Sequence, residues 1–297
     1  MSRRGQSLVN DSLFGFLIVL PSVLLLFLLV LFPVGYVLVL STQDWTATTP
    51  AFTGLSNYVK LLTDDPLFWE FFMHSIEYVV LAIGSATIVG LLVALSLNAI
   101  NKFQGTLRTF ALWCWAVPPV IASLMWKWML NDTSGVMNEL LLRAGLISQP
   151  IAWLSLPVWT MVVLSQVHAW TAIPFITVIL LAGLQTVPVE LHEVAAIDGA
   201  NALQRFRRIT YPLLKPSMLT AVMLSVIFAF RHIDIVFTLT KGGPGEATEL
   251  LVTYLYSNAF DYLRLGYAAA LSVIMVIVSV LIVMLLINVV RAERVEY

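Results

Sequence analysis

Charged side chains are scarce in this sequence of 297 residues, because Asp, Glu, Lys and Arg together make up only 11% of it. Soluble proteins have roughly 25%. Hydrophobic residues make up 60% of the chain, so the composition excludes an ordinary soluble globular protein and indicates one that lies in a membrane. The formal net charge of -1 also argues against nucleic-acid binding, which usually demands a concentrated basic face.

Cysteine and metal-binding patterns are nearly absent. Cys114 is the one cysteine in the sequence, so it forms no internal disulfide and says nothing about the redox compartment. The four histidines form no H-E-x-x-H or Cys/His pattern. We therefore expect no metal site in this chain.

Catalytic motifs are absent as well. The sequence contains no G-x-x-x-x-G-K-[ST] phosphate loop and no G-x-S-x-G nucleophile elbow. It therefore predicts no catalytic residue, and we expect a chain that is not an enzyme and does not hydrolyse ATP itself. An intramembrane enzyme or an assembly factor is an alternative that lacks a recognisable catalytic constellation.

Long apolar stretches are abundant instead. A helix needs about 20 predominantly apolar residues to cross a bilayer. Six such stretches cover residues 13–40, 75–97, 110–130, 156–184, 218–239 and 267–290. The first is too long for the apolar core of a signal peptide, and no small-residue cleavage site follows it, so we interpret it as a retained span. We predict an all-α membrane protein with six transmembrane helices, forming a single domain over residues 1–297.

The loops differ in their content of Lys and Arg, which predicts the orientation of the chain. One side carries ten of the 16 basic residues, namely Arg3, Arg4, Lys102, Arg108, Arg205, Arg207, Arg208, Lys215, Arg291 and Arg294. The other side carries four, namely Lys60, Arg143, Lys241 and Arg264. Cytoplasmic loops carry the excess of Lys and Arg, so both termini are predicted to be cytoplasmic, and the loops near residues 41–74, 131–155 and 240–266 to face outward.

A polar, basic segment at about residues 186–216 interrupts the apolar spans. Pro188 favours a helix start because its missing N–H would be unpaired there anyway, and the acidic residues that follow favour the positive end of a helix. We predict a short helix to about Ile197, a turn at Gly199, which tolerates positive φ, and a second helix from Asn201 that stops before Pro212. The product is a helix–turn–helix on the cytoplasmic face. The alternative is an amphipathic connector held against the lipid surface by its arginines.

The spacing of five residues in this segment resembles the EAA loop of permease subunits of binding-protein-dependent ABC importers. These residues are Glu193, Ala195, Gly199, Ile209 and Pro212. The segment departs from the family pattern at Val194, where alanine is usual, and at Tyr211, where leucine is usual; both substitutes are apolar and conformationally mild.

Further pieces extend the resemblance over most of the chain. GLSNY at residues 54–58, TLTKGGPGEAT at 238–248 and YLYSNAF at 254–260 are similar to the carbohydrate-uptake, MalF-like branch of MetI-like permeases. The resemblance implies a second homologous permease subunit, two ATPase subunits that use ATP and Mg²⁺, an extracytoplasmic solute-binding protein, and a place in the bacterial cytoplasmic (inner) membrane. It implies no cofactor bound by this chain.

The resemblance also assigns two contact regions. The residues expected to couple to the ATPase are Glu193, Val194, Ala195, Asp198, Gly199, Ile209 and Pro212. The cluster at Gly242, Gly243 and Pro244 lacks the Lys-Ser/Thr of a phosphate loop, so we interpret it as an outward turn that contacts the binding protein, with phosphate binding as the alternative.

Polar side chains within the apolar spans indicate a solute path. Ionisable residues at a helix centre cost roughly 2.5–3.5 kcal/mol on insertion scales and suggest a site that faces the helix bundle. Ser225 and His232 are seven residues apart and are expected to share a helical face, while Arg231 and Asp234 are three apart and could pair. Alternatively, these two charges only neutralise each other or pair with a partner subunit.

His168 and Thr171 extend this path onto the fourth span. They lie close in sequence to Trp170 and Phe175, and hydrogen-bonding groups beside aromatic rings suit a sugar. Their distances from the EAA-like segment resemble those of solute-lining positions in the MalF-like branch. Either histidine could instead be a satisfied structural residue.

We therefore predict a permease subunit of an ATP-driven importer for a sugar, an oligosaccharide or a related polyol derivative. The alternative is an ion-coupled secondary carrier that works alone, in which Arg231, His232 and Asp234 relay protons. Such carriers often contain internal repeats and need no docking segment, and the sequence has no visible repeat.

Overall fold

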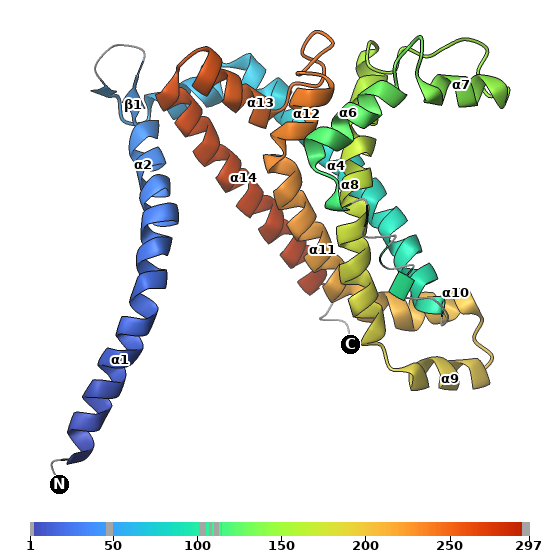
Figure 1. The fold of residues 1–297 in the computed structure, drawn as a ribbon, viewed down its shortest axis with the longest axis horizontal. Helices are drawn as coiled ribbons and strands as arrows, with labels where there is room; N and C mark the ends of the chain where they lie inside the picture. Colours follow the sequence, from blue (N-terminus) through green and yellow to red (C-terminus); the bar gives the residue numbers. More distant parts are fainter. Residues whose placement is uncertain are drawn as a thin grey trace. The chain divides into compact units, whose positions relative to one another are not determined.

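The computed structural model describes residues 3–45, 50–100, 105–106, 109, 113 and 115–292, with side chains from residue 14 to residue 288, and almost all of it is helical (Figure 1). In lipid, backbone polar groups must be satisfied within the segment, which favours helices for these apolar stretches. The predicted all-α membrane class is confirmed.

Five helices in the described part of the chain are long and apolar enough to cross a membrane. They cover Phe14–Ser41, Pro66–Ala99, Pro157–Gln185, Ala202–Arg231 and Leu265–Asn288, and so match five of the predicted spans. The remaining predicted span, residues 110–130, lies partly outside the described residues, and helix α6 (Pro119–Met129) covers its second half. The count of six transmembrane helices stays a prediction.

The chain divides into two compact units, one of residues 1–65 and 256–274 and the other of residues 66–255 and 275–297. The first unit begins with a long rod, in which α1 (Arg3–Leu26) continues through a π-helical turn (Phe27–Leu31) into α2 (Phe32–Ser41). Its other elements are β1 (Gln43–Asp44), β2 (Ala51–Phe52), α3 (Ser56–Val59), π-helical turns at Lys60–Asp64 and Ser257–Asp261, and the start of α14 (Leu265–Ala292).

Asn57 ties these short elements of the first unit together. Its buried side chain donates hydrogen bonds to the backbone oxygens of Ser41, at 3.0 Å, and Gln43, at 2.9 Å. The backbone of α14 approaches the same strand so closely that a Cβ on Gly266 would lie 1.8 Å from the Gln43 oxygen. Glycine is therefore required at that contact.

The second unit holds all the residues that the sequence assigned to a site. Its elements are α4 (Pro66–Ala99), α6, α7 (Val136–Arg143), α8 (Pro157–Gln185), α9 (Val189–Ile197), α10 (Ala202–Arg205), a π-helical turn (Phe206–Thr210), α11 (Tyr211–Arg231), α12 (Ile233–Leu239), most of α13 (Leu251–Tyr256) and the rest of α14. Helices α9 and α10 lie at one end of α8 and α11, and α12 lies at the other (Figure 1).

Small residues bring α4, α8 and α11 together. A Cβ on Gly90 of α4 would lie 2.9 Å from Cγ2 of Ile176 on α8, and a Cβ on Gly183 of α8 would lie 2.4 Å from Oγ of Ser217 on α11. Lipid is as apolar as a leucine side chain, so helices in a membrane associate through close packing, which small residues allow.

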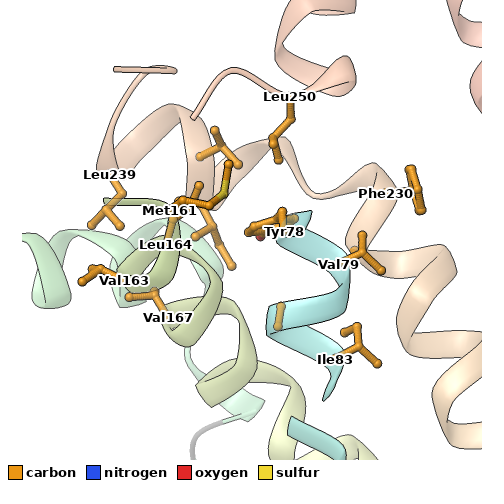
Figure 2. Close-up of a cluster of buried hydrophobic side chains, with 14 of the residues drawn as sticks. Tyr78, Val79, Ile83, Met161, Val163, Leu164, Val167, Phe230, Leu239 and Leu250 are labelled. Carbon is orange, nitrogen blue, oxygen red and sulfur yellow. The ribbon is translucent and has the colours of Figure 1, made fainter. Parts of the chain in front are cut away.

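A buried cluster fills the space between these helices toward the α12 end. Figure 2 shows Tyr78, Val79 and Ile83 of α4 beside Met161, Leu164 and Val167 of α8, with Phe230, Leu239 and Leu250 around them. Tyr78 has none of its surface exposed. This cluster fixes the positions of the helices from which the candidate solute path is built.

Candidate functional site

The segment at residues 186–216 has the geometry of two short helices joined by a tight turn. Helix α9 ends at Ile197, as predicted, and Gly199 has φ +76°. The amide of Gly199 donates to the Ala196 oxygen at 3.1 Å, and the amide of Ala200 donates to the Ala195 oxygen at 2.9 Å. These two bonds form a Schellman motif, in which glycine is the usual residue because the backbone is left-handed there.

A capping box starts the next helix. Oδ1 of Asn201 accepts from the Gln204 amide at 2.9 Å, and Oε1 of Gln204 accepts from the Asn201 amide at 2.8 Å. Two amides that would otherwise be unpaired at the helix start are thereby satisfied. The turn between the helices is thus held at both ends by hydrogen bonds within the segment.

The prediction that the second helix stops before Pro212 is wrong. The helix runs from Ala202 to Arg231 through a π-helical turn, where the Tyr211 amide bonds to the Phe206 oxygen. A proline lacks the N–H that would continue an ordinary helix. Here the change of hydrogen-bond register just before Pro212 lets the helix continue into α11.

Helix α9 exposes apolar side chains on a short, polar segment. Ile197 is 86% exposed and Val194 is 57% exposed. Of the residues predicted to couple to an ATPase, Glu193, Asp198 and Gly199 are also exposed, whereas Ala195, Ile209 and Pro212 are half-buried. Their role in coupling stays a prediction.

A cavity of about 230 Å³ lies between α8 and α11, and four of the six predicted solute-path residues line it. These are His168, Thr171, Ser225 and His232, and the remaining lining residues are Trp115, Val117, Pro119, Ala172, Phe175 and Phe228. The aromatic rings pack edge to face, with 5.7 Å between the ring centroids of Phe175 and Phe228. The cavity thus combines polar groups with aromatic walls, a lining suited to an uncharged hydroxylated molecule.

The helix breaks at His232, which the sequence did not predict. His232 has φ −78° and ψ 91° between α11 and α12, so it does not share a continuous helical face with Ser225. The break nevertheless turns its ring into the cavity, with the ring centroids of His168 and His232 5.3 Å apart.

Arg231 and Asp234 were predicted to belong to the same path, and the structure does not bring them into this cavity. Arg231 lies instead at an apolar groove formed with α14, beside Phe230 and Met275. Among the described residues no ion pair within 4.0 Å joins Arg231 to Asp234, unlike Arg143 and Glu139, which pair at 2.6 Å. The predicted Arg231–Asp234 pair therefore does not form. The break at His232 separates the two charges onto different helices.

Two polar groups at the cavity stand out by their hydrogen bonding. Oγ of Ser225 is buried and has no partner within the described residues, and such a group is costly unless it is satisfied. His168 is 3% exposed, and its Nδ1 lies 2.8 Å from the hydroxyl of Tyr78 on α4. Sequence reasoning missed Tyr78, as well as Trp115 and Phe228; a tyrosine within a span was the available signal.

The turn at residues 240–248 is braced by threonines. Oγ1 of Thr248 donates to the Gly243 oxygen at 2.6 Å, and the Thr248 amide donates to the Gly242 oxygen at 3.0 Å. Gly242 has φ +85°, a conformation that glycine adopts without strain. The turn, which includes Pro244, lies at the α12 end of the second unit, opposite α9 (Figure 1), and its contact with a binding protein stays a prediction.

Comparison with known proteins decides the family. Residues 86–294 match the family of binding-protein-dependent transport system inner membrane components. This chain belongs to that family. It is therefore a multi-pass permease component of the inner membrane, as the EAA-like spacing had indicated.

Individual relatives span nearly the whole permease. The sulfoquinovosyl glycerol transport system permease protein SmoG of Agrobacterium fabrum is 34% identical over 96% of this chain and 92% of its own length. The trehalose/maltose transport system permease protein MalF of Thermococcus litoralis is 34% identical over 89% of each chain.

A solved structure shares the fold. A chain of a bacterial ABC transporter involved in the import of the acidic polysaccharide alginate matches 99% of this permease and 100% of its own length, with a TM-score of 0.80 and 19% identity. A second structure of an alginate transporter, in complex with a periplasmic protein bound to an alginate pentasaccharide, matches with a TM-score of 0.80 and 18% identity.

Proposed function

We propose that this permease translocates a sugar, an oligosaccharide or a related polyol derivative in an ATP-driven importer. It works beside a second homologous permease subunit, above two ATPase subunits that bind ATP and Mg²⁺, and receives its solute from an extracytoplasmic binding protein. The permease itself binds no cofactor and catalyses no reaction. Its termini and α9 are cytoplasmic, and the turn at residues 240–248 faces outward.

The observation that carries this proposal is the placement of three features along one unit. An exposed helix–turn–helix lies at one end, a braced turn lies at the other, and a cavity with polar and aromatic walls lies on the helices that connect them. The exposed Val194 and Ile197 support the docking of a partner onto α9, because apolar side chains on a polar surface segment gain from burial in an interface.

The lining of the cavity and the printed substrates of two relatives support the solute class. His168, Thr171, Ser225 and His232 supply hydrogen-bonding groups, and Phe175 and Phe228 supply apolar faces. Two 34% identical relatives are named for sulfoquinovosyl glycerol and for trehalose and maltose. The cavity is smaller than the roughly 300–1,000 Å³ of typical ligand clefts, so we propose that it holds one sugar unit at a time.

Reconstitution tests the proposal against the ion-coupled carrier. The permease is co-expressed with a second permease subunit, an ATPase and a binding protein of such an importer, purified by a tag on the permease, and tested for uptake of trehalose and maltose. We expect the ATPase to co-purify and uptake to require ATP. Uptake by the permease alone, driven by an ion gradient, would establish the carrier instead.

The orientation has its own test. In a Cys114→Ala background, single cysteines at Arg205 and at Glu246 are labelled with an impermeant thiol reagent in intact cells. We expect labelling at position 246 and none at position 205 until the cells are permeabilised. The reverse pattern would invert the proposed topology.

A further inference from the structure

Tyr78 and His168 form the one hydrogen bond between side chains that links α4 to the lining of the cavity in the described part of the second unit. The Tyr78 hydroxyl lies 2.8 Å from Nδ1 of His168, across 90 positions of sequence. The rings also pack edge to face, with centroids 5.4 Å apart. Tyr78 does not line the cavity itself, so any effect it has on a solute is exerted through His168.

The direction of this hydrogen bond follows from burial. Tyr78 has none of its surface exposed, and within the described residues its hydroxyl has no acceptor besides His168. If Nδ1 carried the proton and donated to Tyr78, the hydroxyl hydrogen would be buried without an acceptor. A buried donor without a partner is costly, so the hydroxyl donates and Nδ1 accepts.

A neutral imidazole that accepts at Nδ1 carries its proton on Nε2. Within the described residues Nε2 of His168 has no hydrogen-bond partner, and His168 lines the cavity. The unpaired Oγ of Ser225 lines the same cavity. The cavity therefore offers a fixed N–H donor from His168 beside a hydroxyl that can donate or accept.

We propose that Tyr78 is a positioning residue that holds His168 in the Nε2–H tautomer, so that the imidazole presents a hydrogen-bond donor to an oxygen of the solute. The class of ligand is an uncharged molecule with a hydroxyl or ether oxygen. That oxygen accepts a hydrogen bond from His168, and the Ser225 hydroxyl forms a further hydrogen bond with the same ligand. The claim that a solute binds to this donor rests on the proposed function. The claim about the tautomer of His168 does not.

The tautomer is measured directly by nitrogen NMR of the full chain in lipid nanodiscs, with ring-¹⁵N histidine and His168→Ala to assign the signal. We expect a single Nε2–H tautomer in the wild type and loss of that single state in Tyr78→Phe. Tyr58→Phe is the matched control, because the Tyr58 hydroxyl shares a 2.7 Å hydrogen bond with Ser41 outside this cavity; it leaves the His168 signal unchanged. An Nδ1–H tautomer in the wild type would overturn the proposal, and this measurement does not depend on any variant folding. An unchanged His168 signal in Tyr78→Phe would also overturn it.

Uptake of trehalose and maltose by the reconstituted complex gives the second measurement. We expect Tyr78→Phe to raise the apparent KM roughly threefold to tenfold, the worth of one hydrogen bond, with little change in maximal rate. In the His168→Ala background the same substitution has no further effect, since Tyr78 acts through His168. Additive effects of the two substitutions would contradict the proposal. If the wild-type complex takes up neither sugar, trehalose and maltose are excluded as its solutes and the NMR result still decides the role of Tyr78.

Discussion

The two regions to which we assign a function in this permease, the α9–α10 segment and the cavity, are built in different ways. The α9–α10 segment is exposed and is held by hydrogen bonds between residues close in sequence, such as the capping box of Asn201 and Gln204. The cavity takes its residues from several helices. Of these residues His168 and Ser225 are buried, and His168 is held by a hydrogen bond with Tyr78, 90 positions away. The proposed docking segment is therefore shaped locally, whereas the proposed solute site depends on how the helices pack.

The largest expected effect is at the exposed segment. Gly199→Val places a β-branched residue at φ +76°, a strain of about 1–3 kcal/mol, and Glu193→Ala removes a carboxylate that we expect to pair with a basic residue of the ATPase. Both should insert normally yet lose most ATPase co-purification, or hydrolyse ATP without transport.

Glu190→Ala is the matched control, because it removes an acidic residue from the first turn of the same helix. It should retain ATPase binding. Full coupling in both Gly199→Val and Glu193→Ala would show that the segment is an inert connector.

Substitutions at the cavity should impair uptake of the solute without impairing ATPase binding. Alanine variants of His168, Thr171, Ser225 and His232 remove polar groups that line the cavity, and lost hydrogen bonds of about 0.5–1.5 kcal/mol each predict a rise in apparent KM of about twofold to tenfold. ATPase co-purification should be unchanged. Wild-type uptake in all four variants at matched protein levels would make these residues structural.

A glycine substitution tests whether α8 and α11 depend on close packing. Gly183→Leu would force α8 and α11 apart, because even a Cβ there lies 2.4 Å from Oγ of Ser217, and such overpacking typically costs about 1–3 kcal/mol. We expect a lower midpoint in a thermal unfolding assay. Gly84→Leu is the control, since a Cβ at Gly84 meets no atom within 4 Å; equal losses in both variants would contradict the close-packing interpretation.

The smallest expected effect is a pH dependence of stability at Glu249, next to the turn at residues 240–248. Burial raises the pKa of Glu249, the charge of Glu246 raises it further, and a hydrogen bond from Thr253 lowers it. A raised carboxyl pKa means that the folded state holds the proton more tightly than the unfolded state, so this contribution to stability is lost as pH rises above the ordinary glutamate pKa. Glu249→Gln should flatten the dependence of the unfolding midpoint between about pH 4 and pH 7, and an identical slope in variant and wild type would exclude this carboxyl as its source.

Local chemistry could be predicted from the sequence, and long-range geometry could not. The end of α9 and the turn at Gly199 follow from residues next to one another, and polar residues stand out within apolar spans, which is why His168 and Ser225 were found. The break at His232 and the continuation through Pro212 depend on how the helix repacks around them. Tyr78 was missed because its partner lies on another helix.

Proteoliposomes that contain the permease, its partner permease and the ATPase test the importer directly. With the binding protein outside and trehalose or maltose as the solute, we predict that uptake requires ATP at the ATPase side, is unaffected by collapse of ion gradients, and is lost in Gly199→Val. Uptake by the permease alone, driven by an ion gradient and indifferent to Gly199→Val and Glu193→Ala, would contradict the proposed function.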